Sequence, residues 1–491
     1  MSQTDNNRHR SILHNLARKA MVDRGFLPDF SQPALQELQS ISQPVIMGGN
    51  GSGRDLRSLL WCSIDNDDSM DLDQLTFAEA LPKGEIKILI AIADVDALVK
   101  KNSALDDHAK QNTTSIYTAG GMFPMLPEKL STDLTSLKFG VERQAIIIEI
   151  VVVDEGSVQR SEIYHAIVVN RAKLAYNSVN AWLEKTGPVP KEMATVPGLD
   201  ANVQLQDQVA QKLKAVRQQH GALHLRTTEA RAVFDNDVLI DLQTETANRA
   251  KEFIENFMVL ANGVTARYLT GKKFPTLRRV VRTPKDWDRI IELALEHGFV
   301  LPKTPDSKAL DEFLLSAEAK DPVRFPDISL SIIKLLGSGE YVVNLPGEPA
   351  IGHFGLAVKD YSHSTAPNRR YPDIITLRLL KASLAQHSVP YEKDELNALA
   401  VHCTEREDEA KKVERQVRKS AEAMLLEHQI GKQFDAIVTG ASAKGTWVRL
   451  LNPPVEGKLM EGFGGLKVGQ RLRVQLIAAE VKRGFIDFRK V

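Results

Sequence analysis

The stretch SIDNDDSMDLDQ, residues 63–74, holds five aspartates within nine positions. Carboxylates this close repel one another unless a cation neutralises them, and hard oxygen ligands are the ones that magnesium and manganese take. The stretch therefore predicts a site for one or two such ions, with a solvated acidic turn as the alternative. An EF-hand calcium loop is excluded, because an alignment from Asp65 puts Met70 at the required glycine and Thr76 at the bidentate acid.

The residues after this acidic stretch alternate between apparent strands and helices. KILIAIADVDALV (87–99) and AIIIEIVVVD (145–154) have the continuous apolar character of buried strands. Apolar residues recur three and four apart over 247–269 and 374–384, which indicates helices. Residues 405–429 are rich in Glu, Lys, Arg and Ala without Pro or Gly, and predict one long helix. The mixture predicts an α+β core.

From Phe434 onward the pattern changes to short strands separated by Gly, Asn and Pro. About five strands in under sixty residues predict a small Greek-key barrel. This segment carries ten Lys and Arg against five Asp and Glu, although the whole chain is balanced at 63 of each. A local excess of positive charge favours nucleic-acid binding there. The basic residues are Lys444, Arg449, Lys458, Lys467, Arg471, Arg473, Lys482, Arg483, Arg489 and Lys490.

Residues 12–50 are expected to form a short helical module, with a second helix starting near Ser31 and Pro33. A helix-turn-helix is possible, but residues 1–50 carry only one excess positive charge, which favours a packing or docking module. GGNGSGR, residues 48–54, has the composition of a flexible linker. We therefore predict three regions: a helical module and linker (1–52), a large α+β domain (53–432) and a barrel (433–491).

The chain has 491 residues, of which 43% are hydrophobic and 26% charged, as in ordinary globular proteins. Cys62 and Cys403 give neither a disulfide framework nor a thiolate metal site, which favours a reducing compartment. No apolar stretch is long enough to span a membrane, and the start MSQTDNNRHR lacks an apolar leader. A cytoplasmic protein without a membrane partner is expected, and a monomer is the default.

A second polar motif, HFGLAVKDYSHSTAPNRRYPD, occupies residues 353–373 and leads into a predicted helix. Arg369 and Arg370 follow Pro367 directly. A guanidinium fork here can grip a phosphate group or the aspartates of the first motif. The alternative is a pair of surface arginines beside a turn.

Together the two motifs resemble the catalytic domain of the RNase II/RNase R (RNB) family of exoribonucleases. The resemblance spans most of residues 60–425 and implies magnesium-dependent (or manganese-dependent), processive hydrolysis of single-stranded RNA from its 3′ end to nucleoside 5′-monophosphates. The C-terminal barrel resembles the OB-type RNA-binding domain that follows the catalytic domain in this family, and the N-terminal helical module stands where many members carry cold-shock barrels. Further matching stretches are TSIYTAGGMFPMLPEKLSTDLTSL (114–137), AKLAYNSV (172–179) and ENFMVLAN (255–262).

The resemblance implies that Asp65, Asp71 and Asp73 bind metal in a two-metal mechanism, with Asp73 also catalytic. Gln74 stands where the family usually has a fourth aspartate. An amide oxygen can coordinate a cation but brings no charge, so metal affinity and catalysis are expected to weaken unless Asp67 or Asp68 compensates.

The resemblance also implies a catalytic role for Arg369, which would hold the scissile phosphate or its developing charge. Arg370 would support the RNA backbone. Residues 365–368 read Thr-Ala-Pro-Asn where the family has Thr-Ser-Pro-Ile, so one hydroxyl is missing. Glu414 aligns with a glutamate implicated in catalysis, and an exposed salt-bridging helix face is the alternative.

RNA contacts are implied for Tyr117 and Tyr176, whose rings would stack on bases, and for Glu255, which would accept a hydrogen bond from a ribose 2′-hydroxyl. Trp447 is a stacking candidate in the barrel. Outside the family context, each tyrosine would be an ordinary core residue and Glu255 a helix-surface residue. A rival hypothesis follows from Gln74: a catalytically weakened or inactive RNA-binding regulator of the same fold.

Overall fold

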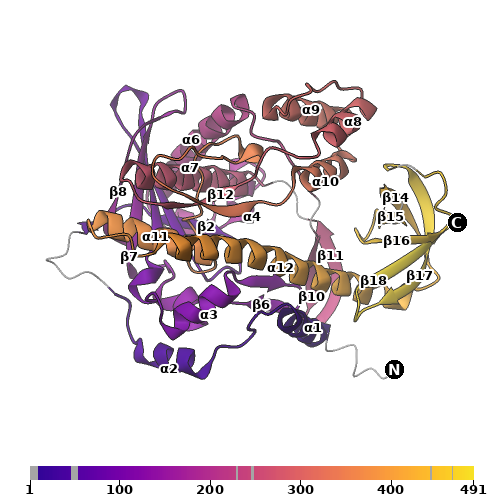
Figure 1. Cartoon of the computed structure of the whole chain (residues 1–491), viewed down its shortest axis with the longest axis horizontal. Coiled ribbons are helices and arrows are strands. Elements are labelled where there is room, and N and C mark those ends of the chain that lie inside the picture. The colour runs from indigo at the N-terminus through magenta and orange to yellow at the C-terminus, as the bar shows by residue number, and fades with distance from the viewer. Residues whose placement is uncertain (1–8, 46–52, 228–229, 245–247, 443–444, 467) are drawn as a thin grey trace.

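The computed structural model describes residues 9–45, 53–227, 230–244, 248–442, 445–466 and 468–491. The α+β class is confirmed: a large mixed sheet with helices lies at one end of the molecule and a closed barrel at the other (Figure 1). Residues 48–52 of the predicted linker, Ala247 of a predicted helix, and Lys444 and Lys467 of the basic segment lie outside the described residues.

The main sheet carries the first polar motif. Its strands are β1 (Arg54–Asp55), β2 (Cys62–Asp65), β3 (Gln74–Ala80), β4 (Ile86–Ala93), β7 (Glu142–Val152), β8 (Val158–Val169) and β9 (Ala172–Ala175). Their order is β1-β8-β7-β4-β3-β2-β9, antiparallel except for the β1/β8 and β2/β9 pairs. The acidic stretch is the connection between β2 and β3, near one edge of the sheet.

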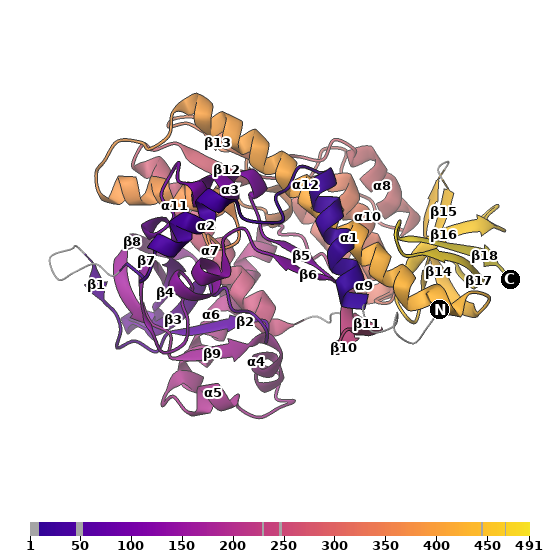
Figure 2. The same cartoon turned by 90° about the horizontal axis from the view of Figure 1, so that it is seen from below.

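The helices surround this sheet and link it to the barrel (Figures 1 and 2). They are α1 (His9–Asp23), α2 (Gln32–Ser40), α3 (Ala104–Asn112), α4 (Tyr176–Leu183), α5 (Lys191–Ala194), α6 (Leu199–Gln219), α7 (Arg249–Gly271), α8 (Trp287–Glu296), α9 (Ser307–Lys320), α10 (Phe325–Leu336), α11 (Tyr371–Leu384) and α12 (Lys393–Leu426).

The core explains why these elements form. The predicted strands at 87–99 and 145–154 correspond to β4 and β7, whose residues are almost all buried and pair in register from Ile86–Val152 to Ala93–Ala145. Strands covered on both faces read as continuous apolar runs. Helix α7 packs on the sheet, and inside it Phe253 and Phe257 meet edge to face at 5.1 Å.

Three small antiparallel pairs lie outside the main sheet. They are β5 (Ile116–Thr118) with β6 (Gly121–Phe123), β10 (Ala230–Asp235) with β11 (Val238–Thr244), and β12 (Thr276–Val280) with β13 (Glu340–Asn344). The first two are hairpins that lie beside α12 and α1 (Figure 2).

Helix α12 is longer than its composition indicated. It begins at Lys393 rather than at Glu405, and ends at Leu426, followed by a single 3₁₀ turn, Glu427–Gln429. Asp394 and Glu395 occupy its first turn, where negative charge favours a helix start. Its 34 residues extend about 50 Å at 1.5 Å per residue, from beside the sheet to the barrel (Figure 1).

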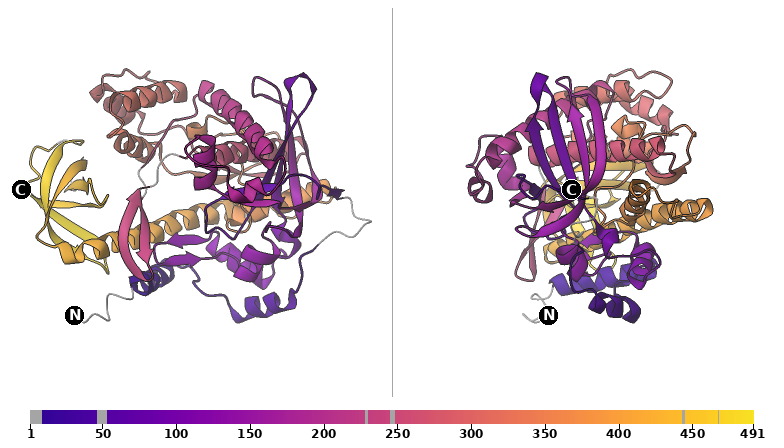
Figure 3. Two further views of the ribbon diagram at one scale, coloured as in Figure 1. Left: turned by 180° about the vertical axis from the view of Figure 1, so that it is seen from behind. Right: turned by 90° about the vertical axis from the view of Figure 1, so that its left-hand side faces the viewer.

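The C-terminal barrel is confirmed. It is closed in the order β14-β15-β16-β18-β17, built from β14 (Gln433–Ser442), β15 (Gly445–Leu450), β16 (Glu456–Glu461), β17 (Arg471–Glu480) and β18 (Phe485–Lys490). Ala423 and Leu426 of α12 belong to the same buried cluster as the barrel interior. Arg449 of β15 makes a two-point ion pair with Asp327 of α10, at 2.7 and 3.1 Å. The barrel is therefore fixed to two helices and lies opposite the sheet (Figure 3).

The N-terminal residues fold as the two predicted helices. The Ser31 side chain caps α2 by accepting from the backbone N–H of Ala34. Helix α1 packs along α12, and α2 packs on α3. Within the described ranges, no helix is long and apolar enough to cross a bilayer.

Candidate active site

Asp73 is the most deeply buried aspartate of the acidic stretch. Its side chain is 2% exposed, and Oδ1 accepts a hydrogen bond from the backbone N–H of Asn368 at 2.8 Å. Oδ2 lies 3.3 Å from Nε of Arg369 but accepts no hydrogen bond. The two polar motifs therefore meet at this carboxylate. Burial raises the pKa of Asp73 to about 7, against the opposing effect of the Arg369 charge.

Asp71 lies beside Asp73 and is linked to α12 through a tyrosine. The hydroxyl of Tyr117, on hairpin β5–β6, donates to Oδ2 of Asp71 at 3.1 Å, and the backbone N–H of Tyr117 donates to Oε1 of Glu414 at 3.1 Å. Burial raises the pKa of both Asp71 and Tyr117, so the phenol stays a neutral donor. Glu414 thus belongs to the site, although it lies more than 300 residues away in the sequence.

Asp65 ends β2 and forms the other side of the acidic loop. Its Oδ1 accepts from the backbone N–H of Asn66 at 2.7 Å and from the Ser69 hydroxyl at 3.0 Å. Asp65 pairs with Ala175 at the end of β9, so the next residue, Tyr176, begins α4 next to it. Burial and the Asp65 charge raise the pKa of Tyr176. The structure therefore brings Tyr176 to the acidic loop.

Arg369 sits in a tight loop that is fixed from within. The N–H groups of Arg369 and Arg370 both donate to the carbonyl of Ala366, and Nη2 of Arg370 donates to Oδ1 of Asp373 at 2.9 Å. The same Asp373 oxygen accepts from the N–H of Ala366 at 2.8 Å. The hydroxyl of Thr135 donates to Oδ1 of Asn368. Asp373 received no role in the sequence analysis, although its spacing of three from Arg370, in the first turn of a helix, was a usable signal.

The side chain of Arg369 remains 43% exposed, and its Nε faces Asp73. Burial alone would lower its pKa, but the surrounding acidic groups, Asp73 foremost, outweigh that effect and raise it. The side chain therefore presents a permanent positive charge at an accessible surface next to three carboxylates. That combination suits a phosphate group bridging a cation and an arginine.

The remaining aspartates of the stretch turn to other partners. Asp68 pairs with Arg231 of β10 at 2.8 Å, and Asp67 accepts from Asn177 at 3.4 Å. Gln74 begins β3 opposite Ile92. Asp67 and Asp68 are both exposed, and these contacts direct them to α4 and β10.

Two predicted RNA-binding residues lie apart from this loop. Glu255 of α7 is 58% exposed and pairs with Arg217 of α6 at 3.4 Å. Trp447 lies half-buried on β15 of the barrel, opposite Gly440. Neither side chain contacts the acidic loop in any recorded interaction of the described residues.

Comparison with known proteins identifies the family of the chain. A family model described as RNB domain matches residues 53–386, about two thirds of the chain. The chain belongs to the RNB family. A second model, the RNase II-type exonuclease C-terminal S1 domain, matches residues 432–491, the barrel.

This RNB chain has similar relatives of known name and structure. Ribonuclease R 1 of Lactococcus lactis subsp. lactis is 27% identical over 96% of the chain, which spans only 60% of that relative's length. The apo form of Mycoplasma genitalium RNase R superposes with a TM-score of 0.87 at 25% identity, covering 99% of this chain and 79% of that one. The same protein in complex with ribose methylated single-stranded RNA gives the same values.

The carboxylate oxygens of the acidic loop are of the kind that binds a magnesium ion. Asp73 offers a buried carboxylate oxygen with no hydrogen bond, which is the kind of atom that a cation stabilises. Among the described residues, no three His, Cys, Asp or Glu side chains converge as a ready-made cage. Magnesium is usually held by one or two carboxylates together with waters and substrate phosphates, so a partial protein site agrees with it.

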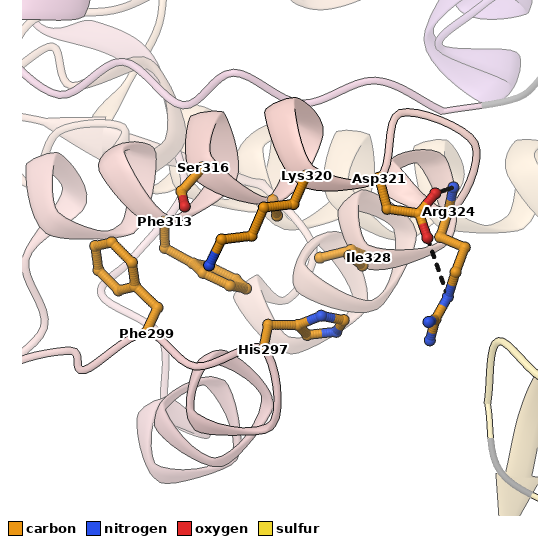
Figure 4. Close-up of a pocket in the computed structure, with 9 residues that line it drawn as sticks. His297, Phe299, Phe313, Ser316, Lys320, Asp321, Arg324 and Ile328 are labelled. Atoms are coloured by element: carbon orange, nitrogen blue, oxygen red, sulfur yellow. Dashed lines mark hydrogen bonds and ion pairs between the residues drawn. The ribbon is translucent and has the colours of Figure 1, made fainter.

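A small pocket lies elsewhere in the RNB domain, among α8, α9 and α10 (Figure 4). Lys320 and Arg324 line it, and Nε of Arg324 lies 3.9 Å from Asp321. None of the predicted site residues lines this pocket, so it is separate from the acidic loop. The other lining residues include His297, Phe299, Phe313 and Ile328.

Proposed function

We propose that the chain is a magnesium-dependent 3′-to-5′ exoribonuclease that processively hydrolyses single-stranded RNA to nucleoside 5′-monophosphates. One observation carries the proposal: the charged, partly exposed side chain of Arg369 lies against the buried carboxylate of Asp73. Membership of the RNB family and the names of the relatives support it.

The proposed reaction is phosphodiester hydrolysis. A water oxygen bonds to phosphorus while the bond from phosphorus to the 3′ oxygen breaks, and a proton ends on that 3′ oxygen. Arg369 would hold the phosphate and stabilise the charge that grows on it. Asp65, Asp71, Asp73 and the amide oxygen of Gln74 would hold magnesium, or manganese in its place. When bound, the ion supplies charge neutralisation and lowers the pKa of a water.

The RNA contacts are proposed from side-chain chemistry. Tyr117 donates its hydroxyl to Asp71 yet remains 45% exposed, so its ring is available to stack on a base at the site. Tyr176 would stack from the opposite side of the acidic loop, and Arg370 would support the phosphate backbone. Glu255 would give up its ion pair with Arg217 and accept a hydrogen bond from a ribose 2′-hydroxyl. Trp447 would stack on upstream RNA at the barrel.

Gln74 favours a second candidate, an RNA-binding protein that hydrolyses slowly or not at all. One carboxylate fewer weakens the hold on a divalent ion. In both candidates the RNA path is the same, so only the rate of hydrolysis separates them.

The two buried, free cysteines support a reducing compartment such as the cytoplasm. We also propose that the chain acts as a monomer, which light scattering after gel filtration tests.

The deciding experiment is a time course with 5′-labelled single-stranded RNA, resolved at single-nucleotide length. Wild type with magnesium is expected to shorten the RNA to a small limit product. EDTA, or the variant Asp73→Asn, is expected to stop shortening while RNA binding persists on a native gel. If wild type binds the RNA but leaves it intact, the result favours the RNA-binding protein that does not hydrolyse it. Full activity of Asp73→Asn would refute the assignment of this site.

A further inference from the structure

Helix α1 lies between two hairpins and contacts both (Figures 1 and 2). On one side are Ile116 and Phe123 of hairpin β5–β6, and on the other is Leu239 of hairpin β10–β11. All three belong to one buried cluster with Leu13 and Met21 of α1. This cluster also includes Val413 and Val417 of α12, so α1 closes a four-element core.

The first turn of α1 holds hairpin β10–β11 by polar contacts. The backbone N–H of Leu239 donates to Nδ1 of His9 at 3.1 Å, and the N–H of Arg10 donates to the carbonyl of Asp237 at 3.2 Å. The Arg10 guanidinium lies 4.5 Å from the ring centre of Phe234. Burial lowers the pKa of His9, which keeps the imidazole neutral and able to accept. Directed hydrogen bonds and a ring contact therefore fix hairpin β10–β11 to the start of α1.

The middle of α1 holds hairpin β5–β6 by close packing. His14 stacks on Phe123 with ring centres 4.9 Å apart. A Cβ atom at Gly120 would come within 2.3 Å of the His14 backbone nitrogen, so only glycine permits this approach. The hairpin turn and the helix are in direct backbone contact.

Both hairpins reach from α1 to the acidic loop. Tyr117 of β5 donates to Asp71, and Arg231 of β10 pairs with Asp68, three residues earlier in the same loop. Helix α1, together with α12, therefore holds the two hairpins whose side chains contact Asp71 and Asp68.

We propose that α1 positions hairpins β5–β6 and β10–β11 on either side of the acidic loop, and so forms the mouth through which single-stranded RNA reaches Arg369. The proposal rests on the proposed function, because RNA is the ligand that the mouth admits. His9 and Arg10 are positioning residues, since they act through β10–β11 and touch no reacting atom.

Positioning of the hairpins by α1 should affect the affinity for RNA and not the rate of hydrolysis. A hairpin that is already held in place adds no ordering cost when RNA binds, whereas a released hairpin must be ordered at that moment. Releasing β10–β11 leaves Arg369, Asp73 and Asp71 in place. Affinity for RNA should therefore fall while the rate of the bound complex is kept.

The test compares three variants of the full chain. The double variant His9→Leu with Arg10→Ala removes the acceptor and the cation that hold β10–β11. The conservative double variant His9→Asn with Arg10→Lys keeps an acceptor and a cation, so it should hold hairpin β10–β11 and bind RNA as wild type does. Arg18→Ala is the matched control, because Arg18 lies on the same helix but pairs with Asp29, away from the hairpins.

Two readouts are measured. Amide hydrogen exchange of residues 230–244 without RNA should be on the order of tenfold faster in the disrupting variant alone, which tests positioning whether or not the chain hydrolyses RNA. With an oligoadenylate, the Kd in the Asp73→Asn background and the KM in the active background should each rise on the order of tenfold, with kcat within about twofold. Unchanged exchange, or a fall in kcat with KM unchanged, would overturn the proposal.

Discussion

The backbone N–H of Asn368 donates to Oδ1 of Asp73 across 295 residues of sequence, and the next residue, Arg369, places Nε 3.3 Å from Oδ2 of the same carboxylate. One peptide unit therefore sets the distance between the buried aspartate and the exposed guanidinium. The chemistry proposed for the site depends on this register.

Arg369→Lys is expected to lower turnover on ribonucleotide substrate by on the order of 10²–10³, because an ammonium cannot reproduce the planar fork at a phosphate. The Kd for single-stranded RNA, measured in the Asp73→Asn background, should change far less. Single-turnover kinetics separate the two quantities. Arg289→Ala, an exposed site on α8, is the control, and an unchanged rate in Arg369→Lys would remove Arg369 from the reaction.

Gln74→Asp is expected to raise the affinity for magnesium by roughly tenfold, since it adds a charged oxygen ligand to the aspartates. The magnesium concentration that gives half-maximal activity and calorimetric manganese binding both measure this. Asn66→Asp adds the same charge to the same loop at an exposed position. Equal gains in the two variants would show that Gln74 occupies no ligand position.

Arg378→Met is expected to lower the free energy of unfolding by about 3–5 kcal/mol, because it leaves the buried carboxylate of Asp106 without its cation. The Arg378 side chain is 4% exposed and lies 2.9 Å from Asp96 and 2.8 Å from Asp106, joining α11 to α3. Urea unfolding checks the value. The exposed control Arg289→Ala should stay within about 0.5 kcal/mol of wild type.

Asp96 makes part of this stability dependent on pH. Burial alone would raise the pKa of Asp96, but Lys381 and Arg378 outweigh burial and lower it below its usual 3.8. The contribution of a carboxylate whose folded pKa is depressed is complete above the unfolded pKa and is lost as pH falls through the folded value. Wild type should therefore lose stability more steeply than Asp96→Asn below about pH 4, as unfolding curves at several pH values would show. Parallel curves would contradict this.

Local pattern was sufficient for much of the fold. The apolar runs of β4 and β7, the turn-rich barrel and the acidic loop all follow from residues that are neighbours in sequence. The start of α12 at Lys393 was missed because the prediction relied on the Glu-, Lys- and Arg-rich composition of residues 405–429. The earlier turns carry a different signal: Leu396, Leu399, Ala400 and Cys403 recur at helical spacing and are buried.

The candidate site was predictable as two motifs but not as one geometry. Sequence patterns brought out Asp73 and Arg369 in separate motifs, and a contact between the two motifs was one of several alternatives until the family resemblance favoured it. The contact of Tyr117 with both Asp71 and Glu414, and the support of the arginine loop by Asp373, depend on tertiary approach between distant segments. No local periodicity carries that information.

Helix α12 carries Glu414 at the active site and Ala423 in the interior of the barrel on one uninterrupted rod. Adding or removing a single residue between them would swing the barrel by about 100° around the helix axis and shift it by about 1.5 Å. The number of residues in this interval is thus under tighter constraint than their identities. Substitutions on its outward face are tolerable, whereas a change of length by one residue would displace the barrel relative to the acidic loop.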